Sequence, residues 1–106
     1  MAFGLSTTDI QRIRQSLESF PEIEKVVIFG SRALGNSKKG SDIDLAIFGE
    51  KVNSSSLLHL RAHLNEELPL PYFFDVVWYE NIESPELKQH IDAHGAVIYQ
   101  MENAKS

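Results

Sequence analysis

Two short apolar segments in the first half of the chain constrain its fold, because each carries polar residues at its end or on one face. Residues 26–32 read Val-Val-Ile-Phe-Gly-Ser-Arg, which is typical of a buried strand that ends in a Gly-Ser turn. Residues 41–48 read Ser-Asp-Ile-Asp-Leu-Ala-Ile-Phe, and their alternation predicts a second strand with its aliphatic residues toward the core. Since alternate side chains share a face, we expect Asp42 and Asp44 to project together from the opposite face.

The chemistry of this acidic pair indicates a metal site. Two carboxylates held side by side repel each other, and the repulsion makes both costly to keep ionised. A divalent cation between them removes the conflict, and hard ions such as Mg²⁺ prefer oxygen ligands of this kind. An Asp-x-Asp pair alone is common in solvated turns, but the flanking aliphatic residues here favour a strand over a surface loop. We therefore interpret Asp42 and Asp44 as metal ligands and catalytic residues.

The Gly30-Ser31 turn has the features of a phosphate-binding turn, and ten residues separate it from Asp42. Glycine lets the backbone approach a phosphate closely and permits positive φ. Ser31 adds a hydroxyl and an amide at the start of an expected short helix over residues 31–34, where anions are favoured. Gly30 and Ser31 are therefore predicted to bind a nucleotide, while Arg32 either contacts a phosphate or pairs with an acid. A plain strand-to-helix turn is the alternative.

A third acid, Asp75, interrupts the apolar run from Tyr72 to Trp78, which reads as the third strand. Burying a carboxylate there costs several kcal/mol unless it is paired or bound to a cation. If this strand lies beside the second, Asp75 falls on the same face as Asp42 and Asp44. Three convergent acids can hold two ions about 3.5–4 Å apart for in-line nucleotidyl transfer. The alternative is an acid at a sheet edge that reaches solvent or pairs with arginine.

The rest of the chain alternates helix and strand patterns. Caps and apolar spacing predict helices after Ser6, after Ser54–Ser56 and after Ser84, and a last strand at Ala96–Tyr99. The order α-β-α-β-α-β-α-β predicts an α/β (α+β) fold with a small mixed β-sheet flanked by helices. We expect a single domain that spans all 106 residues, with a tail that frays from about residue 101.

Composition limits the classes of function. The chain has room for one core and no second module, and its 42% apolar content is that of a soluble globular protein. A formal net charge of −5 argues against direct nucleic-acid binding. The absence of cysteine excludes disulfides, iron–sulfur sites and thiol catalysis. No signal peptide or bilayer-length apolar run is present, so we expect a cytoplasmic protein without membrane association.

Four histidines form two pairs, His59/His63 and His90/His94, each with the spacing of one helix face. Such pairs can bind zinc, but neither has the glutamate of a metalloprotease motif. We interpret them as surface or partner-facing residues.

The long spaced motif of Gly30-Ser31, ten residues and Asp42-Ile43-Asp44 resembles the pattern of the DNA polymerase β-like nucleotidyltransferase superfamily. The surrounding runs are most similar to the minimal nucleotidyltransferases (MNT proteins) of bacteria and archaea, over nearly the whole chain. The resemblance implies a nucleotidyltransferase fold, two Mg²⁺ ions, and ATP or another nucleoside triphosphate as substrate. By position it implies that Asp42 and Asp44 bridge the metals and that Asp75 helps to activate the acceptor hydroxyl. Gly30 and Ser31 match the turn that holds the triphosphate.

The same resemblance bears on partners. Leu34 stands where many relatives have arginine, and this loss removes one cationic group near the triphosphate. Larger relatives bind the acceptor with extra domains, so here a partner must complete the site or be the substrate. Minimal members resemble one half of a two-protein toxin–antitoxin module whose other half is an all-helical HEPN protein.

Three hypotheses follow. The first is Mg²⁺-dependent transfer of a nucleoside monophosphate, AMP from ATP, to a hydroxyl of a HEPN-type helical partner, with this chain as antitoxin in a hetero-oligomer. The second is transfer to a small molecule bound by a helical partner subunit. The third is a non-catalytic antitoxin that inhibits its partner by occlusion, which the three intact acids disfavour.

Overall fold

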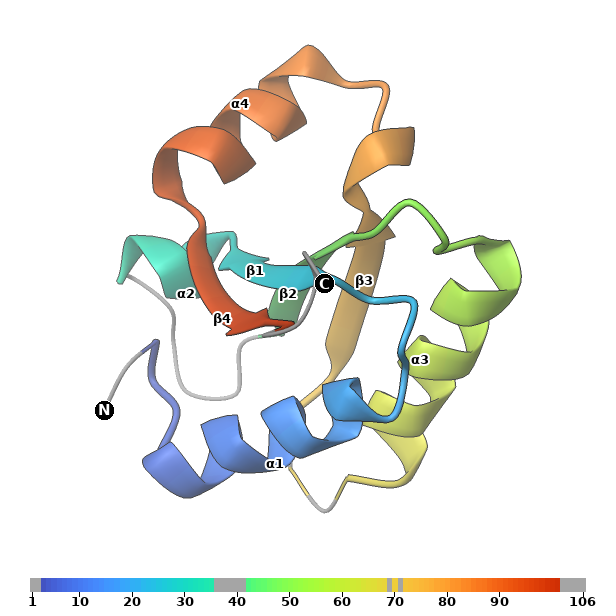
Figure 1. Cartoon of the computed structure of the whole chain (residues 1–106). Coiled ribbons are helices and arrows are strands. Elements are labelled where there is room, and N and C mark those ends of the chain that lie inside the picture. Colours follow the sequence, from blue (N-terminus) through green and yellow to red (C-terminus); the bar gives the residue numbers. More distant parts are fainter. Residues whose placement is uncertain (1–2, 36–41, 69, 71, 102–106) are drawn as a thin grey trace.

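The computed structural model of the chain describes residues 3–35, 42–68, 70 and 72–101. Helices and strands alternate in the order predicted from the sequence, with one additional 3-10 helix before the last long helix (Figure 1). The elements are α1 (Thr7–Glu18), β1 (Lys25–Phe29), α2 (Ser31–Leu34), β2 (Ile43–Phe48), α3 (Ser54–Glu66), β3 (Phe74–Trp78), η1 (Tyr79–Asn81), α4 (Pro85–His94) and β4 (Ala96–Gln100).

The four strands form one mixed sheet in the order β3-β2-β1-β4. β1 is antiparallel to both of its neighbours, β2 and β4, whereas β2 and β3 run parallel and are connected through α3. The small mixed sheet flanked by helices is therefore confirmed. This order puts β2, the strand of the acidic motif, between β1 and β3, and it leaves β3 at an edge.

One face of the sheet packs against α1 and α3 and forms the main core. As the alternation of the second strand predicts, Ile43, Leu45 and Ile47 all point into this core and are fully buried. They meet Leu17 of α1 and Leu60 of α3, which are also buried. The aliphatic residues of these helices recur at helical spacing, so each helix presents one apolar stripe to the sheet.

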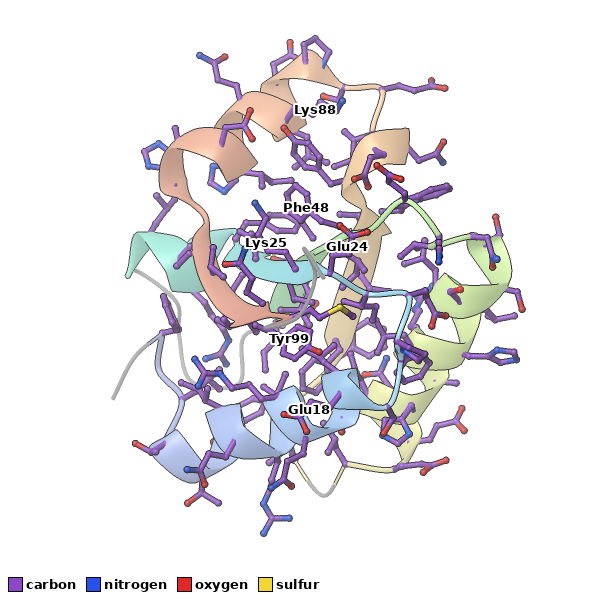
Figure 2. All side chains as sticks on the ribbon, in the orientation of Figure 1. Glu18, Glu24, Lys25, Phe48, Lys88 and Tyr99 are labelled. Carbon is purple, nitrogen blue, oxygen red and sulfur yellow. The ribbon has the colours of Figure 1, made fainter. Side chains whose placement is uncertain are left out.

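The opposite face packs against α4 and forms a smaller cluster, with Val27, Phe29, Ala46 and Ile91 buried. At one end of this face the ring of Phe48 stacks on that of Tyr79 at 4.3 Å between centroids. Lys25 lies over the Phe48 ring and Lys88 over the Tyr79 ring (Figure 2).

Side-chain caps fix the starts of the long helices. Ser6 and Asp9 form a reciprocal capping box at α1, and Ser84 caps α4 with proline at its first position, both as predicted. The cap expected from Ser54–Ser56 is wrong, because Asn53 caps α3 and accepts a hydrogen bond from the Ser56 amide at 2.9 Å. The serines instead form the first turn of that helix.

Strand ends differ by one or two residues from the expected ones. β2 begins at Ile43, and Ser41 lies outside the described residues. β3 begins at Phe74 rather than Tyr72, where the Asn65 side chain of α3 binds both backbone polar groups of Phe74 at 2.7 and 3.0 Å. The expected fraying of the tail concerns residues 102–106, which are also outside that range. No helix in the described part of the chain is long and apolar enough to cross a bilayer.

Candidate active site

The strand register brings the acids of the second and third strands together. Asp44 of β2 lies directly opposite Asp75 of β3 in the parallel ladder and opposite Phe29 of β1 in the antiparallel ladder. Asp42 directly precedes β2 and is exposed. Val77, two residues after Asp75, packs in the cluster beneath α4, so Asp75 projects from the α4 face of the sheet. Asp44 shares that face, because its neighbours Ile43 and Leu45 enter the opposite core.

The charges at this end of the sheet act on one another. The pKa of the Asp44 carboxyl is raised above its ordinary value of 3.8. Partial burial is the largest cause, followed by the negative charges of Asp75 and Asp42. Burial and like charges both disfavour the ionised form, so a cation at this position would restore it.

For Asp75 the structure agrees with the alternative given above, an acid at a sheet edge that reaches solvent, and not with a carboxylate buried among apolar neighbours. β3 is an edge strand, and the Asp75 side chain is exposed. The desolvation cost expected for a carboxylate within an apolar run therefore does not arise. An exposed acid beside a half-buried one leaves the site open to a large molecule from the side of β3.

The three carboxylates fit a hard divalent cation by their chemistry, since Mg²⁺ binds oxygen ligands and offsets their mutual repulsion. Within residues 3–35, 42–68, 70 and 72–101, however, no three His, Asp or Glu side chains stand close enough to hold a metal ion as they lie. Metal binding by Asp42, Asp44 and Asp75 would thus require these side chains to turn toward one another.

The Gly30 turn lies against the acidic strand. Gly30 has φ 80° and ψ −155°, a combination that essentially only glycine adopts. A Cβ at Gly30 would also overlap Oδ2 of Asp44. Both features favour glycine at this position. The sequence indicated that a phosphate could approach Gly30, but it did not indicate the contact with Asp44. Ser31 follows as the first residue of α2 and is exposed.

A histidine from α4 completes the surroundings of the turn. The Gly30 N–H donates a hydrogen bond to Nε2 of His90 at 3.0 Å. The His90 ring packs edge-on against Phe29, with centroids 6.1 Å apart, and lies 5.4 Å from the ring of His94. The sequence did not indicate this contact, and His90 was interpreted as a surface or partner-facing residue. The only available signal was the pairing with His94, and nothing in that spacing points to residue 30.

Arg32 is almost fully buried, at 2% exposed. Its guanidinium donates to the backbone carbonyls of Phe3 at 2.8 Å and Asp42 at 3.3 Å, and it lies 4.8 Å from the Tyr72 ring. These contacts tie α2 to the segment that carries Asp42. The phosphate contact of Arg32 stays a prediction. The sequence did not indicate that the Arg32 guanidinium would bind the backbone of Asp42.

Two hollows can be compared with this site. A groove of about 270 Å³ follows α4 beside the turn and is lined by Glu86, Gln89, His90, Ala93 and His94. A larger one, of about 540 Å³, lies between α1 and β4 and is lined by Arg14, Glu18, Val97, Ile98, Tyr99 and Gln100. Neither hollow is lined by Asp42, Asp44 or Asp75, and the smaller one is lined by His90, the residue that contacts the Gly30 turn.

The chain is similar to known proteins in sequence and in fold. The family described as "Polymerase beta, Nucleotidyltransferase" matches residues 11–104. None of the curated proteins compared with the chain matches it.

Several solved structures share the fold. A chain from a toxin–antitoxin crystal structure with AMP-PNP superposes with a TM-score of 0.73 at 22% identity, covering 90% of this chain and 76% of that one. A chain from the toxin–antitoxin MntA-HepT gives 0.69 at 19% identity, with 92% and 75% covered. A chain from the tri-AMPylated Shewanella oneidensis HEPN toxin in complex with its MNT antitoxin gives 0.69 at 19%, with 93% and 76% covered. At these identities the likeness shows the fold.

Proposed function

The chain belongs to the polymerase β-type nucleotidyltransferase family, and from that premise we propose that it transfers AMP from ATP to a hydroxyl of a HEPN-type helical partner. In this proposal the chain is the antitoxin of a two-protein module. The observation that carries the proposal is one juxtaposition: Asp44 lies opposite Asp75 and against the Gly30 turn. The juxtaposition supports the proposal, because acidic metal ligands beside a turn that can hold phosphate would suit nucleotidyl transfer.

The three acids have distinct places in the proposed reaction. Asp42, Asp44 and Asp75 would hold Mg²⁺, which when bound lowers the pKa of the acceptor hydroxyl and neutralises charge on the pyrophosphate. The acceptor oxygen forms a bond to the α-phosphorus, the bond from the α-phosphorus to the bridging oxygen breaks, and pyrophosphate leaves. Asp75 takes the hydroxyl proton, since it lies on the edge strand β3, where an acceptor can approach.

The nucleotide is assigned to the turn beside these acids. Gly30 and Ser31 would contact the triphosphate, with the Ser31 hydroxyl exposed at the end of β1. Arg32 is a further candidate to contact the triphosphate, because its guanidinium donates a hydrogen bond to the Asp42 carbonyl beside the proposed site. Three carboxylates repel an approaching triphosphate, and the net charge of −5 adds to that repulsion, so the proposed site needs a cation.

Two observations support a protein acceptor. The exposed edge strand leaves Asp75 accessible to a macromolecule. In addition, two of the solved structures with this fold are toxin–antitoxin structures with AMP-PNP or with an AMPylated toxin. A partner hydroxyl as acceptor is consistent with both.

The test is label transfer from ATP labelled at the α-phosphate, with Mg²⁺ and the co-purified helical partner. Label on the partner is expected with the wild-type chain and not with Asp42→Asn/Asp44→Asn. The matched control is Glu50→Gln, an exposed acid just beyond the other end of β2, which should leave transfer unchanged.

Three results would overturn the proposal in different ways. Label on a small metabolite would assign a different acceptor. Neutralisation of the partner by the double variant would favour inhibition by occlusion. Absence of both labelling and Mg²⁺-dependent ATP binding would remove the enzymatic function altogether.

A further inference from the structure

The hydrogen bond between α4 and the glycine turn has no part in the reaction described above. We propose that His90 is a positioning residue for the nucleotidyl transfer: its neutral imidazole fixes the Gly30 backbone against Asp44 by accepting the Gly30 N–H. The inference rests on the proposed function for its catalytic consequence, but the contact itself can be tested without any activity.

Two hydrogen bonds hold the backbone at Gly30. Its N–H donates to Nε2 of His90 at 3.0 Å, and its carbonyl accepts the Leu34 N–H at 3.2 Å. The Asp44 carboxylate lies where a Cβ of residue 30 would stand, so a side chain there would have to displace it. Glycine can adopt the φ 80°, ψ −155° conformation of this turn but also many others, so contacts are needed to select it. His90 supplies the contact that comes from a distant element, α4.

His90 is itself well supported. Its ring packs edge-on against Phe29, the residue before the turn. The next residue in α4, Ile91, is buried against the sheet. At the end of the helix the Gly95 backbone approaches β1 so closely that a Cβ there would overlap Val27 Cγ1. A side chain on a helix packed this tightly can hold a backbone group with little loss of rotamer freedom.

The hydrogen bond also defines the state of the ring. A nitrogen that accepts a hydrogen bond carries no proton, so Nε2 is bare and the proton of the neutral imidazole is on Nδ1. The matched pair of variants follows from this. His90→Gln keeps an acceptor oxygen at a similar reach, whereas His90→Leu fills comparable space without an acceptor.

The direct test is heteronuclear NMR on the wild-type chain without nucleotide. The ¹⁵N shifts of the His90 ring should report the Nδ1-protonated tautomer, and the Gly30 amide should exchange slowly with solvent. In His90→Leu the Gly30 amide should lose protection about threefold to tenfold, the range for one hydrogen bond, and His90→Gln should retain most of it. The opposite tautomer in the wild type would overturn the proposal even if a variant fails to fold.

The catalytic test compares KM for ATP and kcat in the same variants with the co-purified partner. His90→Leu should raise KM for ATP about threefold to tenfold with kcat within about threefold, because the acids remain while the turn loosens. His90→Gln should recover most of the loss, and His59→Leu, an exposed histidine on α3, should match the wild type.

A lower KM in His90→Leu would show that the imidazole competes with phosphate for the Gly30 amide, and it would overturn the positioning role. Equal loss in the Leu and Gln variants would also overturn it, since the acceptor would then not matter. If the wild type shows no transfer, the proposed function fails, while the NMR result still decides whether His90 holds the turn.

Discussion

The two faces of the sheet are built from the same strands but differ in what they carry. The face under α1 and α3 is aliphatic, with Ile43, Leu45 and Ile47 fully buried. From the same strand β2 the other face presents Asp44, Ala46 and Phe48, of which only the alanine is buried. One end of the face under α4 therefore carries acidic side chains in place of buried apolar ones.

This difference shows how a chain of 106 residues carries a charged site. Because the side-chain period of a strand is two, one face can be packed for stability while the other holds like charges. The repulsion around Asp44 costs free energy, and the buried aliphatic face offsets that cost. Changes on the two faces should therefore separate stability from activity.

The largest effect is expected on the charged face, from Asp42→Asn/Asp44→Asn. Transfer to the partner should fall about a thousandfold or more, because several kcal/mol of transition-state stabilisation depend on the metal ligands. The melting temperature in metal-free buffer should stay equal or rise, since a like-charge repulsion disappears. Label transfer measures the activity, and circular dichroism measures the melting temperature. A double variant that unfolds would show that these acids stabilise the fold.

The converse change is Leu45→Ala on the aliphatic face. Leu45 is fully buried, so its truncation should lower the free energy of unfolding by about 2–5 kcal/mol. The fraction that remains folded should transfer label at the wild-type rate per molecule. Urea denaturation and active-site titration measure the two quantities. A loss of less than 1 kcal/mol would mean that this face is not the main source of stability.

Gly30→Ala should reduce stability and activity together, because Gly30 forms the backbone turn and also lies against Asp44 of the candidate site. The positive φ should cost about 1–3 kcal/mol of stability, and the new Cβ should displace the Asp44 carboxylate and reduce transfer strongly. The matched control is Gly35→Ala, which has the same φ of 80° but no atom of the described residues within 4 Å of the added Cβ. That variant should lose stability alone. Equal activity in both alanine variants would contradict the contact with Asp44.

A smaller effect is expected from the helix caps Ser6→Ala on α1 and Ser84→Ala on α4. Each should cost about 1 kcal/mol of stability, since each removes one side-chain acceptor from a helix N-terminus. Only the second should also change the KM for ATP, because α4 carries His90. Thermal unfolding with parallel kinetics tests the pair. An equal change of KM in both would mean that α4 has no special link to the turn.

The smallest effect is on the pH dependence of stability. Because the pKa of Asp44 is raised on folding, the folded state binds more protons than the unfolded state from about pH 3.8 up to the raised pKa. Wild-type stability should therefore decline relative to Asp44→Asn as pH rises through that window, and the difference should level off above it. Urea titrations of both proteins from pH 3 to 7 without Mg²⁺ measure it. A wild-type stability that rises relative to Asp44→Asn as pH increases through this window would contradict the raised pKa.

How far the sequence predicted the molecule depends on whether the signal was local. The strand of the acidic motif and its buried face followed from alternation, and the capped start of α4 followed from Ser84-Pro85. The position of Asp75 beside Asp44 could be stated only as a condition, because strand order is set by the crossover through α3 and not by the strands themselves.

Apart from the α3 cap, which lies one residue before the expected serines, the differences were non-local or depended on exposure. An apolar run does not reveal that its strand is at an edge, so the exposure of Asp75 could be given only as an alternative. His90 meets Gly30 across 60 residues of sequence, and no pattern near either residue indicates that contact. For Arg32 the phosphate or acid contact stays a prediction, and the hydrogen bonds of its guanidinium to the carbonyls of Phe3 and Asp42 had no signal in the sequence.

The central claim is that Asp42, Asp44 and Asp75 beside the Gly30 turn form a Mg²⁺-dependent triphosphate site. Isothermal titration of ATP into the wild-type chain and into Asp42→Asn/Asp44→Asn, each with and without Mg²⁺, tests it most directly. Saturable heat is predicted only for the wild type with Mg²⁺. Equal ATP uptake by the double variant, or no Mg²⁺-dependent uptake by the wild type, would contradict the claim.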